Sequence, residues 1–358
     1  MANAASSTLL RAIGISVPII QAPMAGVSSP AMAAAVSDSG GLGSLGVGAM
    51  TAAKAREAIH AFRQLSKGPL NVNLFVHRPA HADAAKQSAW LARLAPEFQR
   101  YGATPPSSLG EIYTSFLVDH DMLAMLVAER PAVVSFHFGL PTADQLKALR
   151  DAGIYLMASA TDVREAKAVE AAGIDAVIAQ GYEAGGHRGM FDPDAEDSQL
   201  GTLALTRLLV ENVRIPVIAA GGIMDGAGIA AVLKLGASAA QLGTAFVSTD
   251  ESLADAGYRK ALASDAAYAT VMTRAVSGRP ARSLASLFTR LGASVPNAEI
   301  PDYPIAYDAG KALNAAGRAV GEAGYGAHWA GQGAPLARAM STRSLMQVLV
   351  GEWRQATG

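Results

Sequence analysis

Cysteine is absent from this chain, and its absence removes several kinds of chemistry at once. Without a thiol there is no thiolate nucleophile, no iron–sulfur cluster and no cysteine-ligated zinc. Disulfides are excluded as well, so nothing in the composition points to an oxidising compartment. The 358 residues are enough to bury a substantial core without covalent cross-links.

Charge and long apolar runs are also scarce. Charged residues make up 16% of the chain, and 29 Lys and Arg against 30 Asp and Glu give a net charge of −1. Neither sign forms a run that would neutralise a phosphate backbone, so no nucleic-acid partner is expected. The first apolar stretch is interrupted by Gly14 and Pro18 and fits neither a signal peptide nor a membrane span. We therefore expect a cytoplasmic protein without membrane contact.

What the sequence does contain is a series of eight short apolar runs bounded by glycine or proline, which predict strands. Helix-capping residues follow several of them: Ser29 precedes Pro30, Thr51 begins the next helical pattern, and Asp162 with Glu165 has the spacing of a capping box. The predicted strands are residues 17–24, 41–48, 70–76, 132–138, 154–160, 176–180, 215–220 and 239–247.

The order of these elements predicts the fold. Strands that alternate with helices pair in parallel, and strands that are apolar on successive residues are covered on both faces. Eight such units in about 250 residues are typical of a (β/α)8 barrel. The sequence therefore predicts an α/β fold with a TIM barrel over residues 1–248, and an open doubly wound sheet is the alternative.

Two regions exceed a minimal barrel. Residues 77–131 form an insertion after the third strand, with helical patterns near 80–100 and 109–129. Residues 249–334 form an extension, and residues 335–358 are expected to form a helix packed on the barrel. Because connections this long are usually functional covers, we expect a helical lid over the barrel mouth.

Glycine-rich stretches suggest where a ligand binds. Residues 41–46 match G-x-G-x-x-G, but they lie inside an apolar run and not at the start of a helix, so we interpret them as a barrel strand. Gly221-Gly222 and Gly243-Thr244 lie at the carboxyl ends of the seventh and eighth strands, where barrels often bind phosphate through backbone N–H groups. Ordinary tight turns are the alternative for each pair alone, but together they indicate a phosphate-containing ligand.

Residues 179–189 are the most informative segment. Gln180 ends the sixth strand, Gly185 and Gly186 allow the backbone to approach a planar ring, and His187 follows. Histidine is the side chain best suited to proton transfer near neutral pH. We therefore predict that His187 is catalytic, either as a base or as a hydrogen-bond donor.

Other histidines carry weaker signals. His137 alternates with aromatic residues in the fourth strand, and it either points into the pocket or is a buried, hydrogen-bonded side chain. His77 and His81 are four residues apart, but Pro79 disrupts the helix that would align them and no third ligand is evident. No metal site is predicted.

The extension holds the last group of candidates. Tyr303, Tyr307 and Lys311 have four-residue spacing and share one face if the segment is helical. Such a face either binds an anion or is an amphipathic surface packed on the barrel. We take these three residues, with Tyr258 and His137, as candidate substrate-binding residues.

Together these motifs resemble the class I nitronate monooxygenases, formerly called 2-nitropropane dioxygenases. The resemblance extends over nearly the whole chain, and its motifs fall at the predicted strand ends. It rests on QAPMAG at 21–26, NVNLF at 71–75, SFHFGLP at 135–141, residues 179–189 and QLGT at 241–244.

The resemblance implies a barrel that binds FMN without covalent attachment and oxidises alkyl nitronates with O₂ to a carbonyl compound and nitrite. The family's catalytic histidine would correspond to His187. Two other functions stay open: an NAD(P)H-dependent FMN quinone or enoyl reductase on the same barrel, and a flavin- or phosphate-ligand-binding protein without turnover. The implied FMN contacts are Met24, Asn73, Gln180, Gly185, Gly186, Gly222, Gln241, Leu242, Gly243 and Thr244.

Overall fold

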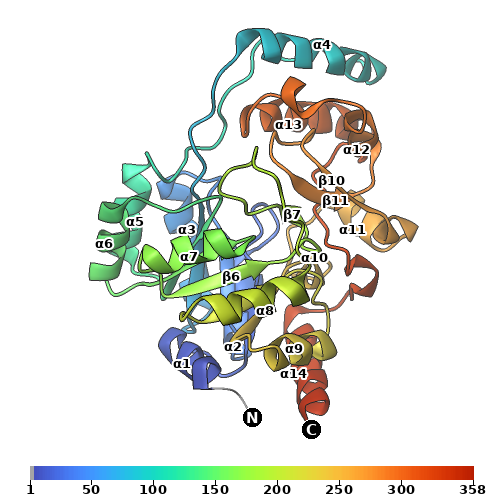
Figure 1. Ribbon diagram of the computed structural model, residues 1–358. Coiled ribbons are helices and arrows are strands. Elements are labelled where there is room, and N and C mark those ends of the chain that lie inside the picture. The colour runs from blue at the N-terminus through green and yellow to red at the C-terminus, as the bar shows by residue number, and fades with distance from the viewer. Residues whose placement is uncertain (1–3) are drawn as a thin grey trace.

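The computed structural model describes residues 4–358 and contains a closed barrel of parallel strands (Figure 1). The barrel closes where Gln21 donates its N–H to the Leu42 carbonyl and Leu42 donates to the Ile19 carbonyl, both at 3.0 Å. This closure confirms the predicted (β/α)8 barrel against the open sheet. In sheet order the strands are β1 (Ile19–Gln21), β9 (Ala239–Leu242), β8 (Val217–Ala220), β6 (Ala176–Gln180), β5 (Tyr155–Ala160), β4 (Val133–His137), β3 (Leu70–Phe75) and β2 (Gly43–Gly46).

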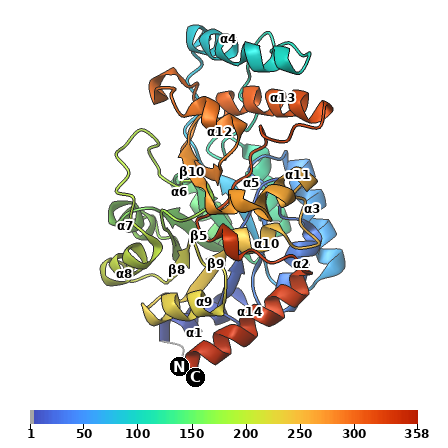
Figure 2. The same cartoon turned by 90° about the vertical axis from the view of Figure 1, so that its right-hand side faces the viewer.

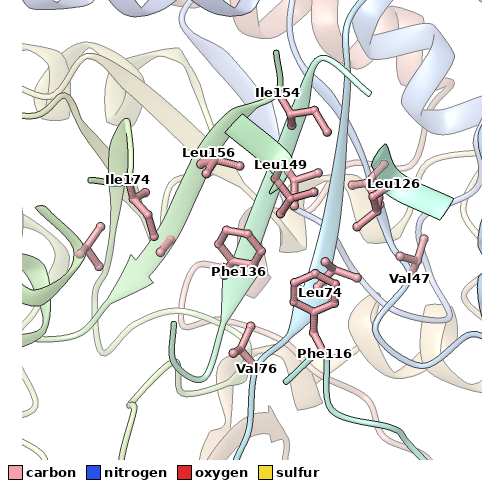
Figure 3. Packing of buried hydrophobic residues seen from close by; sticks show 14 of the residues in the cluster. Val47, Leu74, Val76, Phe116, Leu126, Phe136, Leu149, Ile154, Leu156 and Ile174 are labelled. Atoms are coloured by element: carbon pink, nitrogen blue, oxygen red, sulfur yellow. The ribbon is translucent and has the colours of Figure 1, made fainter. Parts of the chain in front are cut away.

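Helices surround the barrel and bury their apolar faces against the strands. Ser29 and Thr51 cap their helices as predicted, each accepting the N–H of the residue three positions on. Figure 3 shows part of the core between the two layers, in which Phe136, Leu74 and Leu126 belong to one buried cluster. The surrounding helices are α2 (Pro30–Asp38), α3 (Ala52–Leu65), α5 (His120–Glu129), α6 (Ala143–Asp151), α7 (Val163–Ala171), α8 (Thr202–Asn212), α9 (Gly226–Lys234) and α14 (Thr342–Thr357).

The two chain ends complete the barrel. Helix α1 (Ala4–Ile13) buries Leu9 and Ile13 against Ile178 and Ile218 of the barrel interior, which closes the amino end of the strands. Helix α14 lies beside α9 and α2 (Figure 2), so it takes the place of the eighth barrel helix. Residues 243–341 therefore lie between the eighth strand of the barrel and its eighth helix.

The insertion and the extension stand together at the opposite end from α1 (Figures 1 and 2). Helix α4 (Ala84–Arg100) packs on α13 (Ile305–Ala319) through Trp90, Phe98 and Leu313. An antiparallel sheet of β10 (Thr270–Thr273), β11 (Ala281–Leu284) and β7 (Gly186–His187) joins the extension to the loop after β6. The remaining elements are α10 (Thr244–Val247), α11 (Ala256–Leu262), α12 (Leu287–Gly292), and the 3-10 turns η1 (Asp265–Tyr268), η2 (Asn297–Glu299) and η3 (Ala334–Leu336).

Several predicted elements have different bounds in the structure; the first two strands, for example, are shorter than the predicted runs 17–24 and 41–48. The eighth strand ends at Leu242, and residues 244–247 are helical because Gly243 interrupts the extended backbone. Residues 109–119 are not helical, although the pattern predicted a helix there. Phe116 donates its backbone N–H to the Phe75 carbonyl at 3.0 Å, so this segment is held against the end of β3.

The predicted capping box at α7 is also incomplete. Asp162 accepts the N–H of Glu165 at 2.7 Å and caps the helix. The Glu165 carboxylate does not return to the Asp162 backbone, because it accepts N–H groups from Thr161 and Phe191, both at 2.7 Å. Glu165 was expected to complete the cap of one helix, but its carboxylate instead connects two loops at the barrel mouth.

The position of α14 leads to a test of barrel stability. Leu349 is fully buried between α14 and the barrel helices, whereas its neighbour Val348 is 37% exposed. We expect Leu349→Ala to lower the free energy of unfolding by about 3 kcal/mol, because it leaves a cavity in this interface. Val348→Ala is the matched control and should change it by less than about 0.5 kcal/mol. Urea unfolding measures both, and equal effects would show that α14 is not part of the cooperative core.

Candidate active site

A cavity of about 580 Å³ lies between the carboxyl ends of the barrel strands and the residues above them. Strand ends and βα loops form its floor, and the insertion and extension contribute its walls. A second hollow of about 570 Å³, beside α12, contains no predicted site residue. The predicted residues that line the first cavity are Met24, Asn73, His137, Gln180, Gly185, Gly186, His187, Gly222, Gln241, Gly243, Thr244, Tyr258, Tyr303, Tyr307 and Lys311.

Leu242 is the predicted site residue that does not line this cavity. Its side chain belongs to the buried cluster between the barrel and α14, and its carbonyl accepts the N–H of Ala22 at 2.8 Å. Successive side chains of a strand point to opposite faces, so Gln241 and Leu242 cannot both face the cavity. Gln241 is the one that does.

The side-chain amides on the cavity floor differ in how many of their hydrogen-bonding atoms are already bonded to the protein. Gln180 is committed to the protein, because it donates to the His187 carbonyl at 2.9 Å and accepts the Gly189 N–H at 2.7 Å. Asn73 donates to the carbonyl and hydroxyl oxygens of Ser135 at 3.2 and 3.0 Å. The Oε1 atom of Gln241 is buried and has no hydrogen-bond partner in the described part of the chain. It is therefore the amide oxygen most in need of a ligand donor.

Different structural constraints act on the glycines around the cavity. A Cβ at Gly185 would lie 2.4 Å from the Gly331 nitrogen, so glycine is needed there for contact with the protein's own backbone. Gly222 and Gly186 have φ values of 69° and 76°, which favour glycine. At Gly243 φ is −108°, and a Cβ would meet only Ala22 and Met24, at 3.5 Å or more. The backbone of Gly243 is therefore unstrained, and the space beside it is open to a side chain or a ligand group.

His187 stands on the two-residue strand β7 and not in an irregular loop. Its strand pairs with β11, and its Nε2 atom lies 2.9 Å from the Ser277 hydroxyl. Within residues 4–358 the Nδ1 atom has no hydrogen-bond partner. Aromatic rings surround the imidazole: the centroids of Phe138, Tyr303 and Trp329 lie 5.5, 5.4 and 5.1 Å from its own.

His137 lines the same cavity, but both of its ring nitrogens are engaged. Its Nε2 lies 3.1 Å from the His187 carbonyl and its Nδ1 lies 2.9 Å from the Ser159 hydroxyl. A carbonyl accepts only, so Nε2 carries the proton and Nδ1 accepts from the serine. His137 therefore orients the backbone of His187 in this structure.

The candidates in the extension meet at the cavity although only two of them share a helix. Helix α13 begins at Ile305, so Tyr303 precedes it, while Tyr307 and Lys311 lie on it. The Tyr303 hydroxyl is buried without a partner in the described residues. The Lys311 ammonium lies 5.5 Å from the Tyr307 ring centroid and 4.8 Å from that of Tyr113. Tyr258 donates its hydroxyl proton to the Trp329 carbonyl.

Burial controls the ionisation of these groups. It lowers the pKa of His137 and of His77 to about 4, and it holds the pKa of His187 well below 6.5, with further lowering by His137 and Arg279. Burial raises the pKa of Tyr307 to about 12 and that of Tyr303 well above 10. The imidazoles are therefore neutral and the phenols are protonated at neutral pH.

Sequence reasoning missed several residues of the site. Tyr113 and Trp329 line the cavity, but they come from irregular segments whose pattern carries no periodic signal. Ser277 meets His187, and Arg279 lies in the same turn behind Phe138, only because β11 pairs with β7. Non-local strand pairing of this kind leaves no trace in local sequence.

Residues 4–358 also lack a metal-binding cluster and a membrane-spanning helix. The described His, Asp and Glu side chains form no group of three that could hold a metal ion. Among the described helices none is both long and apolar enough to cross a bilayer.

Comparison with known sequences places the chain in a family. A sequence profile of the nitronate monooxygenase family matches residues 6–352. The chain is 63% identical over 348 residues to a nitronate monooxygenase of Paraburkholderia phytofirmans, an alignment that covers 97% of this chain and 95% of that protein. It is 54% identical over 346 residues to a nitronate monooxygenase of Pseudomonas aeruginosa, which covers 96% and 98% of the two chains.

Solved structures resemble it over the same length. A nitroalkane oxidase from Streptomyces ansochromogenes superposes with a TM-score of 0.89 at 42% identity, covering 98% of this chain and 99% of that one. FabK from Thermotoga maritima superposes with a TM-score of 0.74 at 29% identity, covering 98% and 96%. Profile, close relatives and fold agree over almost the entire sequence, and the chain belongs to the nitronate monooxygenase family.

Proposed function

We propose that this chain binds FMN and oxidises alkyl nitronates with O₂ to a carbonyl compound and nitrite. The observation that carries the proposal is the composition of the cavity, which brings a neutral histidine, two protonated phenols and an ammonium group together over the strand ends. A nitronate is an anion with a polarisable carbon–nitrogen unit, and these groups suit its charge and shape. Residues 249–334 act as the cover of the FMN-binding barrel.

The residues present fit a bound FMN. The buried Oε1 of Gln241, which has no partner among the described residues, can accept a hydrogen bond from an N–H or O–H group of the flavin. The open space beside Gly243 allows the phosphate to approach the backbone. The family is flavin-dependent in general. When bound, FMN would supply the transfer of electrons to O₂. The residues that would hold it are Met24, Asn73, Gln180, Gly185, Gly186, Gly222, Gln241, Gly243 and Thr244, with Gly222, Gly243 and Thr244 at the phosphate.

The protein's own groups account for substrate binding and proton transfer. His187 is neutral, so its free ring nitrogen can accept the α-proton of a neutral nitroalkane, and once protonated it can donate a hydrogen bond to the nitronate that forms. The buried hydroxyl of Tyr303, which has no hydrogen-bond partner within residues 4–358, can donate to a nitro oxygen. Lys311 supplies the positive charge at the rim. The aromatic walls exclude water from the space between these groups.

The FMN site can be tested at Gly243. We expect Gly243→Val to weaken FMN binding at least about tenfold, because its methyl groups occupy space that the phosphate would need, while the unfolding temperature of the apoprotein changes little. Flavin fluorescence during reconstitution of the apoprotein measures affinity, and chromatography of the flavin released by denaturation should identify FMN and not FAD.

Gly222→Ala tests the second glycine of the proposed phosphate site. Its φ of 69° is unfavourable for alanine, so this variant should lose stability whether or not FMN binds. Unchanged FMN affinity in Gly243→Val would contradict the proposed phosphate position. An apoprotein that cannot be reconstituted with FMN would contradict the cofactor itself.

Turnover tests the reaction and the role of His187. The wild-type holoenzyme should release nitrite and consume O₂ with a panel of alkyl nitronates. His187→Asn should lower kcat/KM for neutral nitroalkanes about 10²- to 10⁴-fold and that for preformed nitronates less, because their proton is already gone. Wild-type rates with both substrate forms would show that His187 is not catalytic. Rapid anaerobic bleaching of the flavin by NADPH, without nitrite release in the aerobic assay, would identify a reductase instead.

The pH profile follows from the lowered pKa of His187. A base works in its unprotonated form, and a pKa well below 6.5 keeps His187 unprotonated as the pH falls to that value. The kcat/KM of the wild type for a neutral nitroalkane should therefore be level near pH 6.5 and fall only at lower pH. A half-maximal value at or above pH 6.5 would be inconsistent with the buried, neutral imidazole.

A further inference from the structure

The turn between β10 and β11 meets the catalytic histidine from outside the cavity. Ser277 and Arg279 are buried in this turn, and neither lines the cavity. Pairing of β11 with β7 places Ala281 opposite His187, and Arg188 donates its N–H to the Pro280 carbonyl at 2.8 Å. The turn is therefore held in register with the histidine.

We propose that Ser277 sets the tautomer of His187, so that Nδ1 is the atom presented to the substrate, and that Arg279 keeps the imidazole uncharged. Both are positioning residues, since they act through His187. The proposal rests on the proposed function, in which His187 exchanges a proton or a hydrogen bond with the substrate.

The tautomer follows from the bonds of the Ser277 hydroxyl. Its oxygen lies 2.9 Å from His187 Nε2, 3.3 Å from the Arg279 carbonyl and 3.4 Å from the Arg279 nitrogen. A hydroxyl has one proton and two lone pairs. All three contacts are satisfied when it donates to the carbonyl and accepts from the Arg279 N–H and from Nε2–H. Nδ1 is then left with its lone pair.

The opposite tautomer leaves a buried group unsatisfied. If Ser277 donated to Nε2, the Arg279 carbonyl would lose the donor that this structure gives it, at a residue that is 3% exposed. An unpaired buried carbonyl is destabilising, because it loses its hydrogen bond to water without gaining another. The Nε2–H form is therefore favoured, and it is the form that leaves a base at Nδ1.

Arg279 is a buried cation without an acidic partner. No described carboxylate lies within 4.0 Å of its guanidinium group, which donates to the Met190 carbonyl and lies 4.3 Å from the Phe138 ring centroid. The Phe138 backbone has a φ of 78°, a left-handed conformation uncommon for an aromatic residue. The Phe138 ring in turn packs edge-on against His187. Phe138 thus separates the arginine from the imidazole.

The groups that face His187 come from β4, from the segment after β3, from the extension and from the turn. Two of them carry a fixed positive charge: Arg279 behind the ring, and Lys311, whose ammonium lies 5.5 Å from the centroid of the Tyr307 ring that packs on His187. His137 and His77 are neutral, Tyr303 and Tyr307 are protonated, and Arg188 next along the chain is paired with Asp197 at 2.8 Å. A positive charge behind the ring opposes its protonation.

Nitrogen-15 NMR of the imidazole rings tests the tautomer without measuring activity. In the wild-type holoenzyme, with His187 assigned by comparison with His187→Asn, the shifts should identify protonated Nε2 and bare Nδ1. Ser277→Ala should give a mixture of both tautomers, and Ser277→Thr, which keeps the hydroxyl, should restore the single form. A wild type with protonated Nδ1 would overturn the proposal even if the Ser277→Ala variant did not fold.

The same spectra test Arg279 by pH titration. Arg279→Met should raise the pKa of His187 by about one unit, whereas Arg279→Lys, which keeps the charge, should change it much less. Arg279→Gln is the second neutral variant if the methionine protein does not fold. Equal His187 titration in all three variants and the wild type would show that Arg279 is purely structural.

Kinetics provide the functional comparison. Ser277→Ala should lower kcat for a neutral nitroalkane about tenfold with little change in KM, and Ser277→Thr should recover most of it. The matched control is Ser37→Ala, a buried serine at the other end of the barrel whose hydroxyl donates to backbone carbonyls. It should leave kcat unchanged. Equal losses in Ser277→Ala and Ser37→Ala would contradict a specific role.

Failure of the proposed function would be seen separately. In that case the wild type would release no nitrite from any nitronate, while the NMR tautomer and the Arg279-dependent titration would still be observed. Failure of this inference alone would leave wild-type nitrite release intact with the wrong tautomer or an unresponsive titration.

Discussion

The pairing of two residues of β7 with β11 is the contact on which the site depends. Gly186 and His187 belong to the loop after barrel strand β6, and Ala281 and Arg282 belong to the extension. This short antiparallel pairing fixes the His187 imidazole between the barrel floor and the aromatic residues above it. The His187 carbonyl is held from the other side by Gln180 and His137. A loop side chain is thereby given the positional precision of a sheet residue.

The order of elements explains how the extension is held in place. Residues 243–341 leave the barrel after β9 and return as α14, which packs between α9 and α2. Both ends of the extension are thus anchored in the barrel wall. The insertion adds a second support, since α4 packs on α13. A cover that is fixed at three points can enclose a cavity whose walls come from segments far apart in the chain.

Some glycines of the site are required by contacts within the protein, whereas others leave room for a ligand. Gly43 in β2 is required because a Cβ would lie 2.0 Å from the Ala33 carbonyl of α2, and Gly185 is required by the backbone of Gly331. These positions serve close contact within the protein. Gly243 is different, since its surroundings would accept a side chain. The presence of glycine in a motif therefore does not by itself identify a ligand contact.

The sequence by itself determined the barrel, because eight apolar runs between glycine or proline and the caps at Ser29 and Thr51 are local signals. It also located the floor of the site, since Asn73, Gln180 and Gln241 occupy the carboxyl ends of parallel strands and so must meet. Helix α1 was not expected, and the helix predicted over residues 109–129 begins only at His120, because the preceding segment is held to the end of β3 by the backbone hydrogen bond of Phe116. Only the tertiary structure decided that Gln180 is committed to His187, that Leu242 faces away, and that Ser277 and Arg279 lie behind the imidazole. Those relations arise from pairing and packing between distant segments, and no local sequence pattern encodes which distant groups will meet.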